Sequence, residues 1–94
     1  MLTIMKRIHI IISGDVQGVF FRHHTNKTAQ KLGLKGFVKN LANGCVEVVA
    51  EGPEEKIKEF IAFCKKGPES SYVDKVEMNY EEPKNDFTTF SIRY

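Results

Sequence analysis

Long apolar runs are absent from this 94-residue chain. The run Ile10-Ile11-Ile12, like every other apolar run of the chain, falls far short of the roughly 20 residues that a membrane-spanning helix needs. The first twelve residues also lack the apolar core and cleavage site of a secretory signal. Cysteine is scarce, and Cys45 and Cys64 are neither a closely spaced metal-ligand pair nor a disulfide framework. These absences predict a cytoplasmic protein with two free thiols and no membrane partner.

Nucleotide-binding motifs and low-complexity tracts are missing too. Neither G-x-x-x-x-G-K-[ST] nor G-x-G-x-x-G occurs, so no mononucleotide or dinucleotide cofactor is expected. Apolar residues make up 41% of the chain and charged residues 28%, which is typical of an ordinary water-soluble globule. A chain of this length can build only one core, so residues 1–94 are predicted to form a single domain.

Charge is distributed unevenly along the chain. Residues 1–40 carry seven Lys and Arg against one acid, whereas residues 41–94 carry seven against eleven. The first half is therefore the one expected to bind an anion, although most of its lysines also fit ordinary solvent-exposed helix and strand faces.

Hydrophobic periodicity predicts five strands and two helices. Gly33 is expected to end the first helix, and Pro53 to stand in the first turn of the second. Asn43-Gly44 predicts an antiparallel hairpin between strands two and three, because both residues tolerate positive φ. The predicted strands are residues 7–13, 36–41, 45–51, 76–80 and 90–94, and the predicted helices are residues 21–32 and 52–66.

This order of elements predicts an α+β fold, the ferredoxin-like split β-α-β-β-α-β sandwich. Two helices would lie on one face of a mainly antiparallel sheet, with a short fifth strand at the C-terminus. Right-handed crossovers would place the first and third strands side by side in the middle of the sheet. The loop at residues 14–19 would then lie near the strand-two end of the hairpin, and that neighbourhood is the candidate site.

A glycine-bearing loop, residues 14–19, leaves the first predicted strand and enters the first helix. Such a loop can turn several N–H groups into one concavity, where the helix N-terminus adds partial positive charge. Arg22, in the first turn, could donate two charge-assisted hydrogen bonds to a phosphate. The two glycines could equally serve only a tight turn.

Asn40 lies near the end of the second predicted strand, on the opposite face from Phe37. Its amide can accept and donate hydrogen bonds, so it could orient a water molecule toward phosphorus. An asparagine at a strand end could also simply cap a turn.

The letters around these residues resemble the acylphosphatase family. Residues 14–22, GDVQGVFFR, resemble its signature G-x-V-Q-G-V-x-[FY]-R, and residues 36–47 resemble its second signature, G-[WF]-V-x-N-x-x-[DN]-G-x-V-E. The resemblance extends over nearly the whole chain. Departures are Asp15, Phe20 and Asn43, and the Asp15 carboxylate could weaken binding of an anion.

The resemblance implies hydrolysis of an acyl phosphate to a carboxylate and inorganic phosphate, without metal ion, cofactor or covalent phosphoenzyme. Arg22 and N–H groups of the loop would bind the phosphoryl group, and Asn40 would position the attacking water. The implied phosphate-binding residues are Val16, Gln17, Gly18, Val19, Phe20, Phe21 and Arg22.

The histidines offer an alternative chemistry. His23 and His24 follow Arg22 and could act as a general base or a phosphohistidine site. Consecutive helix residues point about 100° apart, so at most one could face the site. His9 alternates with buried isoleucines and is expected to be structural. No carboxylate or cysteine completes a metal-ligand set with the three histidines.

Two non-enzymatic alternatives also follow from the fold class. RNA-recognition domains share this plan, but residues 45–51 carry no stacking aromatics and the second half is acidic, so no nucleic-acid partner is expected. Acylphosphatase-like domains also begin large hydrogenase-maturation proteins that handle carbamoyl phosphate. Here the sequence stops at Tyr94 without a linker, and a free-standing, monomeric enzyme is expected.

Overall fold

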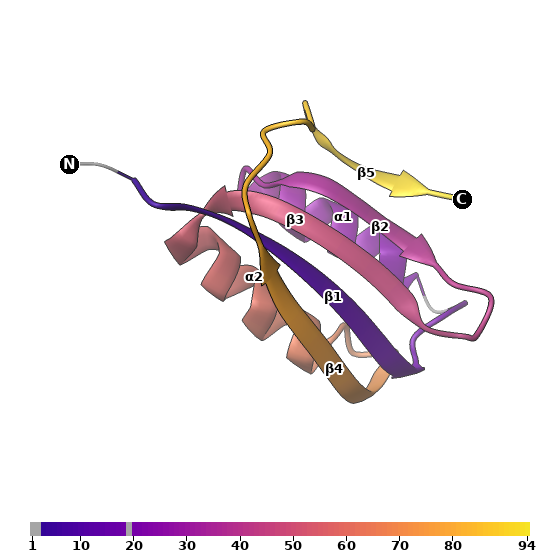
Figure 1. Ribbon diagram of the computed structural model, residues 1–94. Helices are drawn as coiled ribbons and strands as arrows, with labels where there is room; N and C mark the ends of the chain where they lie inside the picture. Colours follow the sequence, from indigo (N-terminus) through magenta and orange to yellow (C-terminus); the bar gives the residue numbers. More distant parts are fainter. Residues whose placement is uncertain (1–2, 19) are drawn as a thin grey trace.

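The computed structural model describes residues 3–18 and 20–94 and confirms the predicted α+β plan. Its five strands form one sheet in the order β4-β1-β3-β2-β5, with β1 and β3 adjacent as expected. No helix in the described ranges is long and apolar enough to cross a membrane. The elements in Figure 1 are β1 (Met5–Asp15), α1 (Phe21–Lys31), β2 (Lys35–Asn40), β3 (Val46–Pro53), α2 (Glu54–Lys66), β4 (Tyr72–Glu81) and β5 (Phe90–Arg93).

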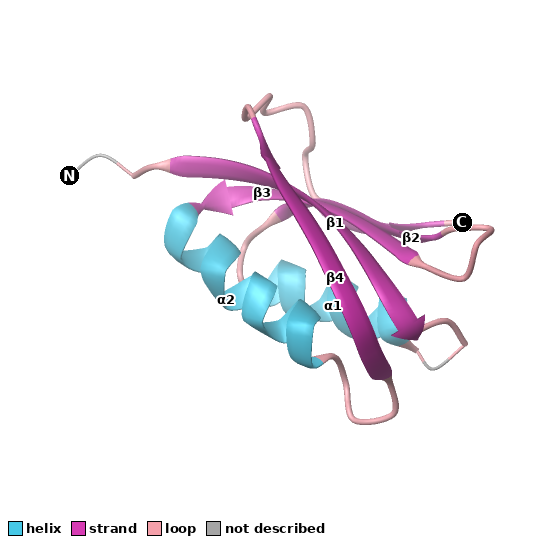
Figure 2. Cartoon of the chain, turned by 60° about the horizontal axis from the view of Figure 1, so that its bottom comes forward, coloured by secondary structure: helices cyan, strands magenta, loops and turns pink. Residues whose placement is uncertain are grey.

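Both helices cover the same face of the sheet, as Figure 2 shows. The β1–β3, β1–β4 and β2–β3 pairs are antiparallel, whereas β5 runs parallel to β2. This parallel pair carries the C-terminus to the end of the sheet that also holds the β2–β3 turn (Figure 1). Chain segments that are distant in sequence therefore meet at one end of the molecule.

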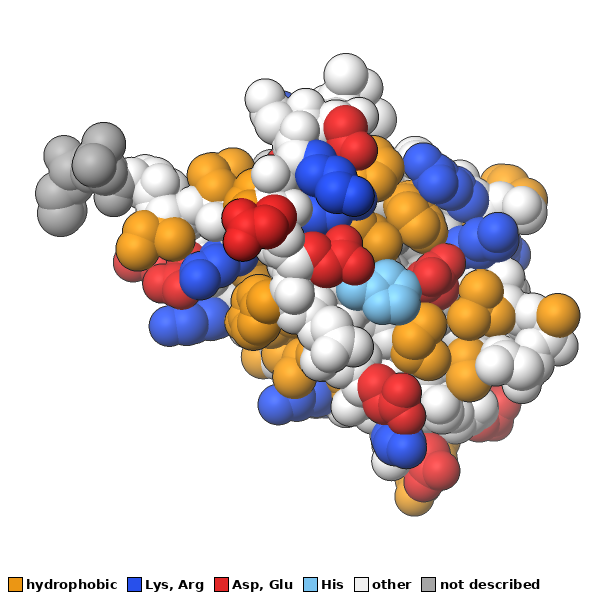
Figure 3. Space-filling view, viewed as in Figure 1, with side chains coloured by type: hydrophobic (Ala, Val, Ile, Leu, Met, Phe, Trp, Pro, Cys, Tyr) orange, Lys and Arg blue, Asp and Glu red, His pale blue; other side chains and the backbone are white. Residues whose placement is uncertain are grey.

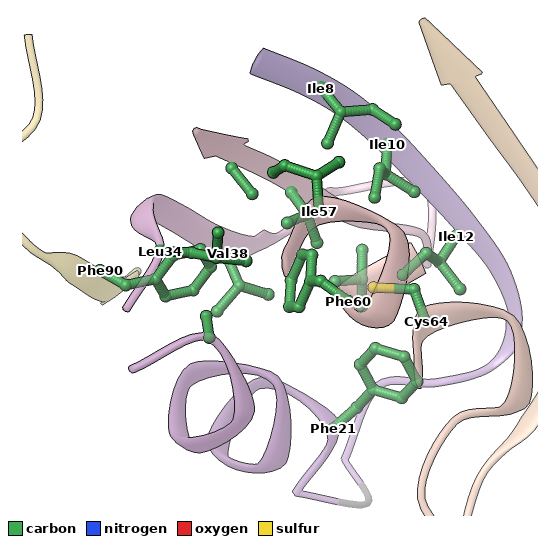
Figure 4. Close-up of a cluster of buried hydrophobic side chains, with 14 of the residues drawn as sticks. Ile8, Ile10, Ile12, Phe21, Leu34, Val38, Ile57, Phe60, Cys64 and Phe90 are labelled. Carbon is green, nitrogen blue, oxygen red and sulfur yellow. The ribbon is translucent and has the colours of Figure 1, made fainter. Parts of the chain in front are cut away.

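The core lies between the sheet and the helices (Figure 4). Ile8, Ile10 and Ile12 are fully buried, because alternate residues of β1 point to the helix-covered face. Phe60 and Cys64, one helical turn apart on α2, are fully buried opposite them. Burial raises the pKa of the Cys64 thiol. Both cysteines are free, as predicted.

Gly33 ends α1 as expected. It adopts a left-handed φ of 73°, and its N–H donates to the carbonyl of Gln30 while the Leu34 N–H donates to that of Ala29. This double hydrogen bond is the usual C-terminal cap with glycine in the left-handed position.

Pro53 does not stand in the first turn of α2, contrary to the prediction. It is the last residue of β3, paired with Met5, and its backbone at φ −58° and ψ 140° is extended. The strand pairing with β1 runs further than the apolar alternation indicated, so the helix starts at Glu54, two residues later than the predicted residue 52.

The β2–β3 hairpin forms as predicted, but its turn uses positive φ at Gly44 only, at 91°. Asn43 contributes its side chain instead, and its Oδ1 accepts a hydrogen bond from the Cys45 N–H at 3.0 Å. The short polar side chain thus replaces the second left-handed residue.

The helix-free face of the sheet carries a mixture of acidic, basic and apolar side chains (Figure 3). Over this face the connection from β4 to β5 is held by charged groups. Glu51, only 5% exposed, accepts hydrogen bonds from the N–H groups of Lys84 and Asn85, both at 2.9 Å. Arg7, 7% exposed, donates to Asp86 at 2.8 Å. These contacts fix the path by which the chain reaches β5.

Candidate active site

A cavity of about 390 Å³ opens where β1 ends, α1 begins and the ends of β2 and β5 meet. All the site residues predicted from the sequence line this cavity, with two exceptions. Gln17 is not in the lining, and Val19 lies outside the described residues. The lining consists of Val16, Gly18, Phe20, Phe21, Arg22, His23, Asn40, Ile92 and Tyr94.

The two glycines of the loop serve different needs. Gly14 has φ 134°, and a Cβ there would collide with the Tyr72 carbonyl oxygen on β4. Gly18 has φ 75°, but a Cβ would meet open space. Gly14 is therefore required by close backbone packing, and Gly18 by the left-handed turn that leads toward α1.

Gln17 connects the loop to the hairpin. Its Nε2 donates to the carbonyl oxygens of Leu41 and Cys45, both at 2.8 Å. The sequence placed the loop beside the strand-two end of the hairpin, and these two bonds confirm that arrangement. They also give the Gln17 side chain a positioning role that the sequence did not reveal.

The N-terminus of α1 carries uncompensated positive character. The first hydrogen bond of the helix runs from the His24 N–H to the Phe20 carbonyl, so the N–H groups of Phe21, Arg22 and His23 have no partner within the helix. Phe20 provides no side-chain cap, and the first turn holds no acidic residue. This helix end is therefore available to an anion.

Arg22 is half-buried and has spare hydrogen-bond donors. Its Nη1 makes a long contact of 3.4 Å to the Arg93 carbonyl oxygen, and its guanidinium lies 4.8 Å from the centre of the Tyr94 ring. Among the described residues it forms no ion pair with any carboxylate. A guanidinium in this state can make a two-pronged contact with a phosphate.

Asn40 brings a buried polar atom to the same cavity. Its Oδ1 is buried and has no hydrogen-bond partner among the described residues. Thr25 Oγ1 and Asn26 Oδ1 are buried without a partner as well, but neither residue lines the cavity. An unpaired buried acceptor costs free energy, which makes Asn40 the group in this lining most in need of a donor such as water.

Three lining residues were not predicted for the site. His23 faces the cavity while His24 does not, in keeping with the expectation that at most one histidine could do so. Ile92 and Tyr94 come from the end of the chain. Their alternation with Phe90 predicted the fifth strand, but nothing in that pattern indicated that β5 would pair with β2 beside the loop.

The remaining titratable candidates lie elsewhere. His9 does not line the cavity; it pairs through Nε2 with Glu47 at 2.8 Å on the helix-free face, an arrangement consistent with the structural role expected for it. Asp15 is exposed and does not belong to the lining. Its carboxylate, which could have weakened binding of an anion, is therefore not at the cavity wall. Within residues 3–18 and 20–94, no three His, Cys, Asp or Glu side chains gather as a metal site.

Comparisons with known proteins identify the family to which the chain is similar. The family model for acylphosphatases matches residues 8–92. An acylphosphatase of Caldivirga maquilingensis is 46% identical over 89 residues, 94% of each chain. The crystal structure of acylphosphatase from Bacillus subtilis is 36% identical, with a TM-score of 0.91 over 97% of this chain and all of that one. Full-length HypF in its phosphate- and nucleotide-bound form is 33% identical, with a TM-score of 0.90; the match covers all of this chain but 12% of HypF.

Proposed function

Because the chain belongs to the acylphosphatase family and is thus a hydrolase of that kind, we propose that it cleaves acyl phosphates by direct attack of water on phosphorus. The oxygen of the water forms the new bond to phosphorus, and the bond between phosphorus and the acyl oxygen breaks. A carboxylate leaves, and inorganic phosphate is the second product. One proton of the water passes to a phosphate oxygen of the substrate.

The phosphoryl group binds at the N-terminus of α1. Arg22 supplies two donors, and N–H groups from Val16 to Phe21 supply the rest of the cradle. Support comes from the helix end without acid or cap and from the guanidinium without a carboxylate partner. These groups neutralise charge on the equatorial oxygens, which is the main requirement for transfer of a phosphoryl group with a good leaving group.

Asn40 holds the attacking water. The observation that carries the proposal is its buried, unpaired Oδ1 in the wall of the cavity that also contains Arg22. A water that donates to this oxygen would be fixed in position before attack. Positioning of this kind contributes to the rate without a strong base, and the leaving carboxylate requires none.

The proposal includes the conditions under which the enzyme works. It acts as a cytoplasmic monomer on a small acyl phosphate, and it uses no metal ion, cofactor, nucleic acid or membrane. Two free cysteines are compatible with a reducing compartment.

The test separates the two proposed roles. Turnover of benzoyl phosphate is measured in buffer containing EDTA, together with competitive inhibition by inorganic phosphate. We expect Arg22→Ala to lower kcat/KM by on the order of 10²–10³ and to weaken inhibition by phosphate, because the charged donors are lost. Asn40→Ala should lower kcat strongly while phosphate still inhibits at nearly the original concentration.

Lys27→Ala is the matched control, since it removes one positive charge from an exposed position of the same helix. It should leave both measurements unchanged. Equal weakening of phosphate inhibition by Arg22→Ala and Asn40→Ala would contradict the division of roles. Absence of turnover by the unaltered protein in EDTA would contradict the proposed metal-free hydrolysis.

A further inference from the structure

Phe20 has a backbone conformation that its side chain does not favour. Its φ is 60° and its ψ 20°, in the left-handed region; among the described residues other than glycine, only Asn85 shares a positive φ. Asparagine tolerates this region, whereas phenylalanine is strained there. Strain of this kind persists where surrounding structure or function requires it.

Packing gives no reason for an aromatic ring at this position. Phe20 is 77% exposed, so its ring gains little from burial. The ring also has no aromatic or cationic contact among the described residues. Tyr94, the other strongly exposed aromatic residue of the cavity, differs because its ring already lies over Arg22. Glycine would relieve the strain at position 20 without loss of a buried contact.

The position of the ring relates it to one part of a bound substrate. Phe20 lines the same cavity as Arg22 and Asn40, and its high exposure places it at the mouth. With the phosphoryl group at the helix N-terminus, the acyl group must point outward, past the mouth. We propose that the Phe20 ring is the wall against which the acyl group packs. This inference rests on the proposed function and specifies its substrate class.

The lining indicates which acyl groups fit. Phe20, Ile92 and Tyr94 supply apolar and aromatic surface to the lining, and Arg22 is the one Lys, Arg, Asp or Glu side chain in the described lining. A charged acyl group would have to compete with the phosphate for Arg22. A flat apolar acyl group, by contrast, can stack on an exposed aromatic ring. Aryl acyl phosphates are therefore preferred to small ones such as acetyl phosphate.

The test compares kcat/KM for benzoyl phosphate and acetyl phosphate. Both substrates carry the same phosphoryl group, so a disturbance of the phosphate cradle cancels from the ratio of the two values. We expect Phe20→Gly to reduce the benzoyl-to-acetyl ratio about tenfold, the size of effect that one lost apolar contact has on specificity. Phe20→Tyr retains a ring and should keep the ratio within about twofold.

Tyr72→Ala is the matched control, because Tyr72 is also an exposed aromatic residue, 67% exposed, but lies on β4 outside the cavity lining. It should change neither value. An unaltered ratio in Phe20→Gly would overturn the role of Phe20 while leaving the proposed hydrolysis intact. Failure of the unaltered protein to hydrolyse either substrate would instead overturn the proposed function, and this inference with it.

Discussion

Two arginines on opposite sides of the sheet show how the same side chain serves two purposes. Arg7 is 7% exposed and has three carboxylate partners: Asp86 at 2.8 Å, Glu81 at 3.1 Å and Glu51 at 3.5 Å. Arg22 is half-buried and has one long contact to a carbonyl oxygen. The donors of Arg7 are in use within the fold, whereas those of Arg22 remain available to a ligand.

The surroundings of Arg7 also explain why its guanidinium stays charged although it is buried. Burial acts to lower the pKa of Arg7, but hydrogen bonds with Asp86 and Glu81 outweigh it and raise the pKa overall. The guanidinium therefore stays charged and ties together β1, β3, β4 and the segment that leads to β5. A structural arginine thus differs from a binding arginine in whether its donors are already occupied by carboxylates of the fold, and not in burial alone.

The largest effect that would test the comparison is expected from Arg7→Met. The variant leaves Glu51 buried with its charge unpaired, although two N–H groups still reach it, and we expect the free energy of unfolding to fall by about 3 kcal/mol. Urea denaturation measures this loss. The double variant Arg7→Met/Glu51→Gln removes the orphaned charge and should recover part of the stability. A fully stable Arg7→Met protein that has lost inhibition by phosphate would make Arg7 the binding arginine and reverse the comparison.

A smaller effect on stability, but a clear one on activity, is expected from Gln17→Met. Two hydrogen bonds between loop and hairpin are lost, at about 1 kcal/mol each, and the loop is no longer held beside Asn40. We expect kcat/KM for benzoyl phosphate to fall roughly tenfold, since displacement of the cradle by a fraction of an ångström disturbs the attack geometry.

Gln30→Met provides the matched control for Gln17. Gln30 also donates through Nε2 to a backbone carbonyl, that of Phe90 at 3.1 Å, but at a point outside the cavity lining. It should lose stability comparable to one hydrogen bond and keep its activity. If the two variants lost activity equally, the loop-to-hairpin bonds would have no special part in the site.

Most of the fold could be predicted from the sequence because its signals are local. The alternation of Ile8, Ile10 and Ile12 marks β1, Gly33 ends α1, and Asn43-Gly44 forms the hairpin turn. The error at Pro53 has the opposite origin, since pairing with Met5 extends β3 beyond its apolar pattern. The end of a strand cannot be predicted from local periodicity when it depends on pairing with another strand.

The same distinction applies to the site. Arg22, Asn40 and the loop lie within short signature segments, so the sequence alone predicted that they belong to one site. Ile92 and Tyr94 enter the cavity only because β5 pairs with β2, and that pairing follows a connection held by Arg7 and Glu51 on the other face. The contribution of Gln17 likewise depends on two carbonyl groups of the hairpin, more than twenty residues away along the chain. Such contacts are properties of the assembled sheet.

The smallest effect distinguishes the exposed rim of the Arg7 cluster from its buried centre. The hydrogen bond from Arg7 holds the pKa of the Asp86 carboxyl below its usual value. Because the folded pKa is the lower one, this stabilisation is fully present above the unfolded pKa of about 3.9 and is lost as the pH falls through the folded value. We therefore expect the difference in unfolding free energy between the unaltered protein and Asp86→Asn to be constant above about pH 5 and to shrink in more acidic solution. Urea titrations from pH 6 to pH 2.5 measure it. Glu77, whose pKa is lowered by its hydrogen bond with Lys75, is present in both proteins and cancels in the subtraction. A difference that stayed constant into the acid range would mean that Asp86 contributes nothing through its charge, and that Glu51 and Glu81 alone are the charged partners that hold Arg7.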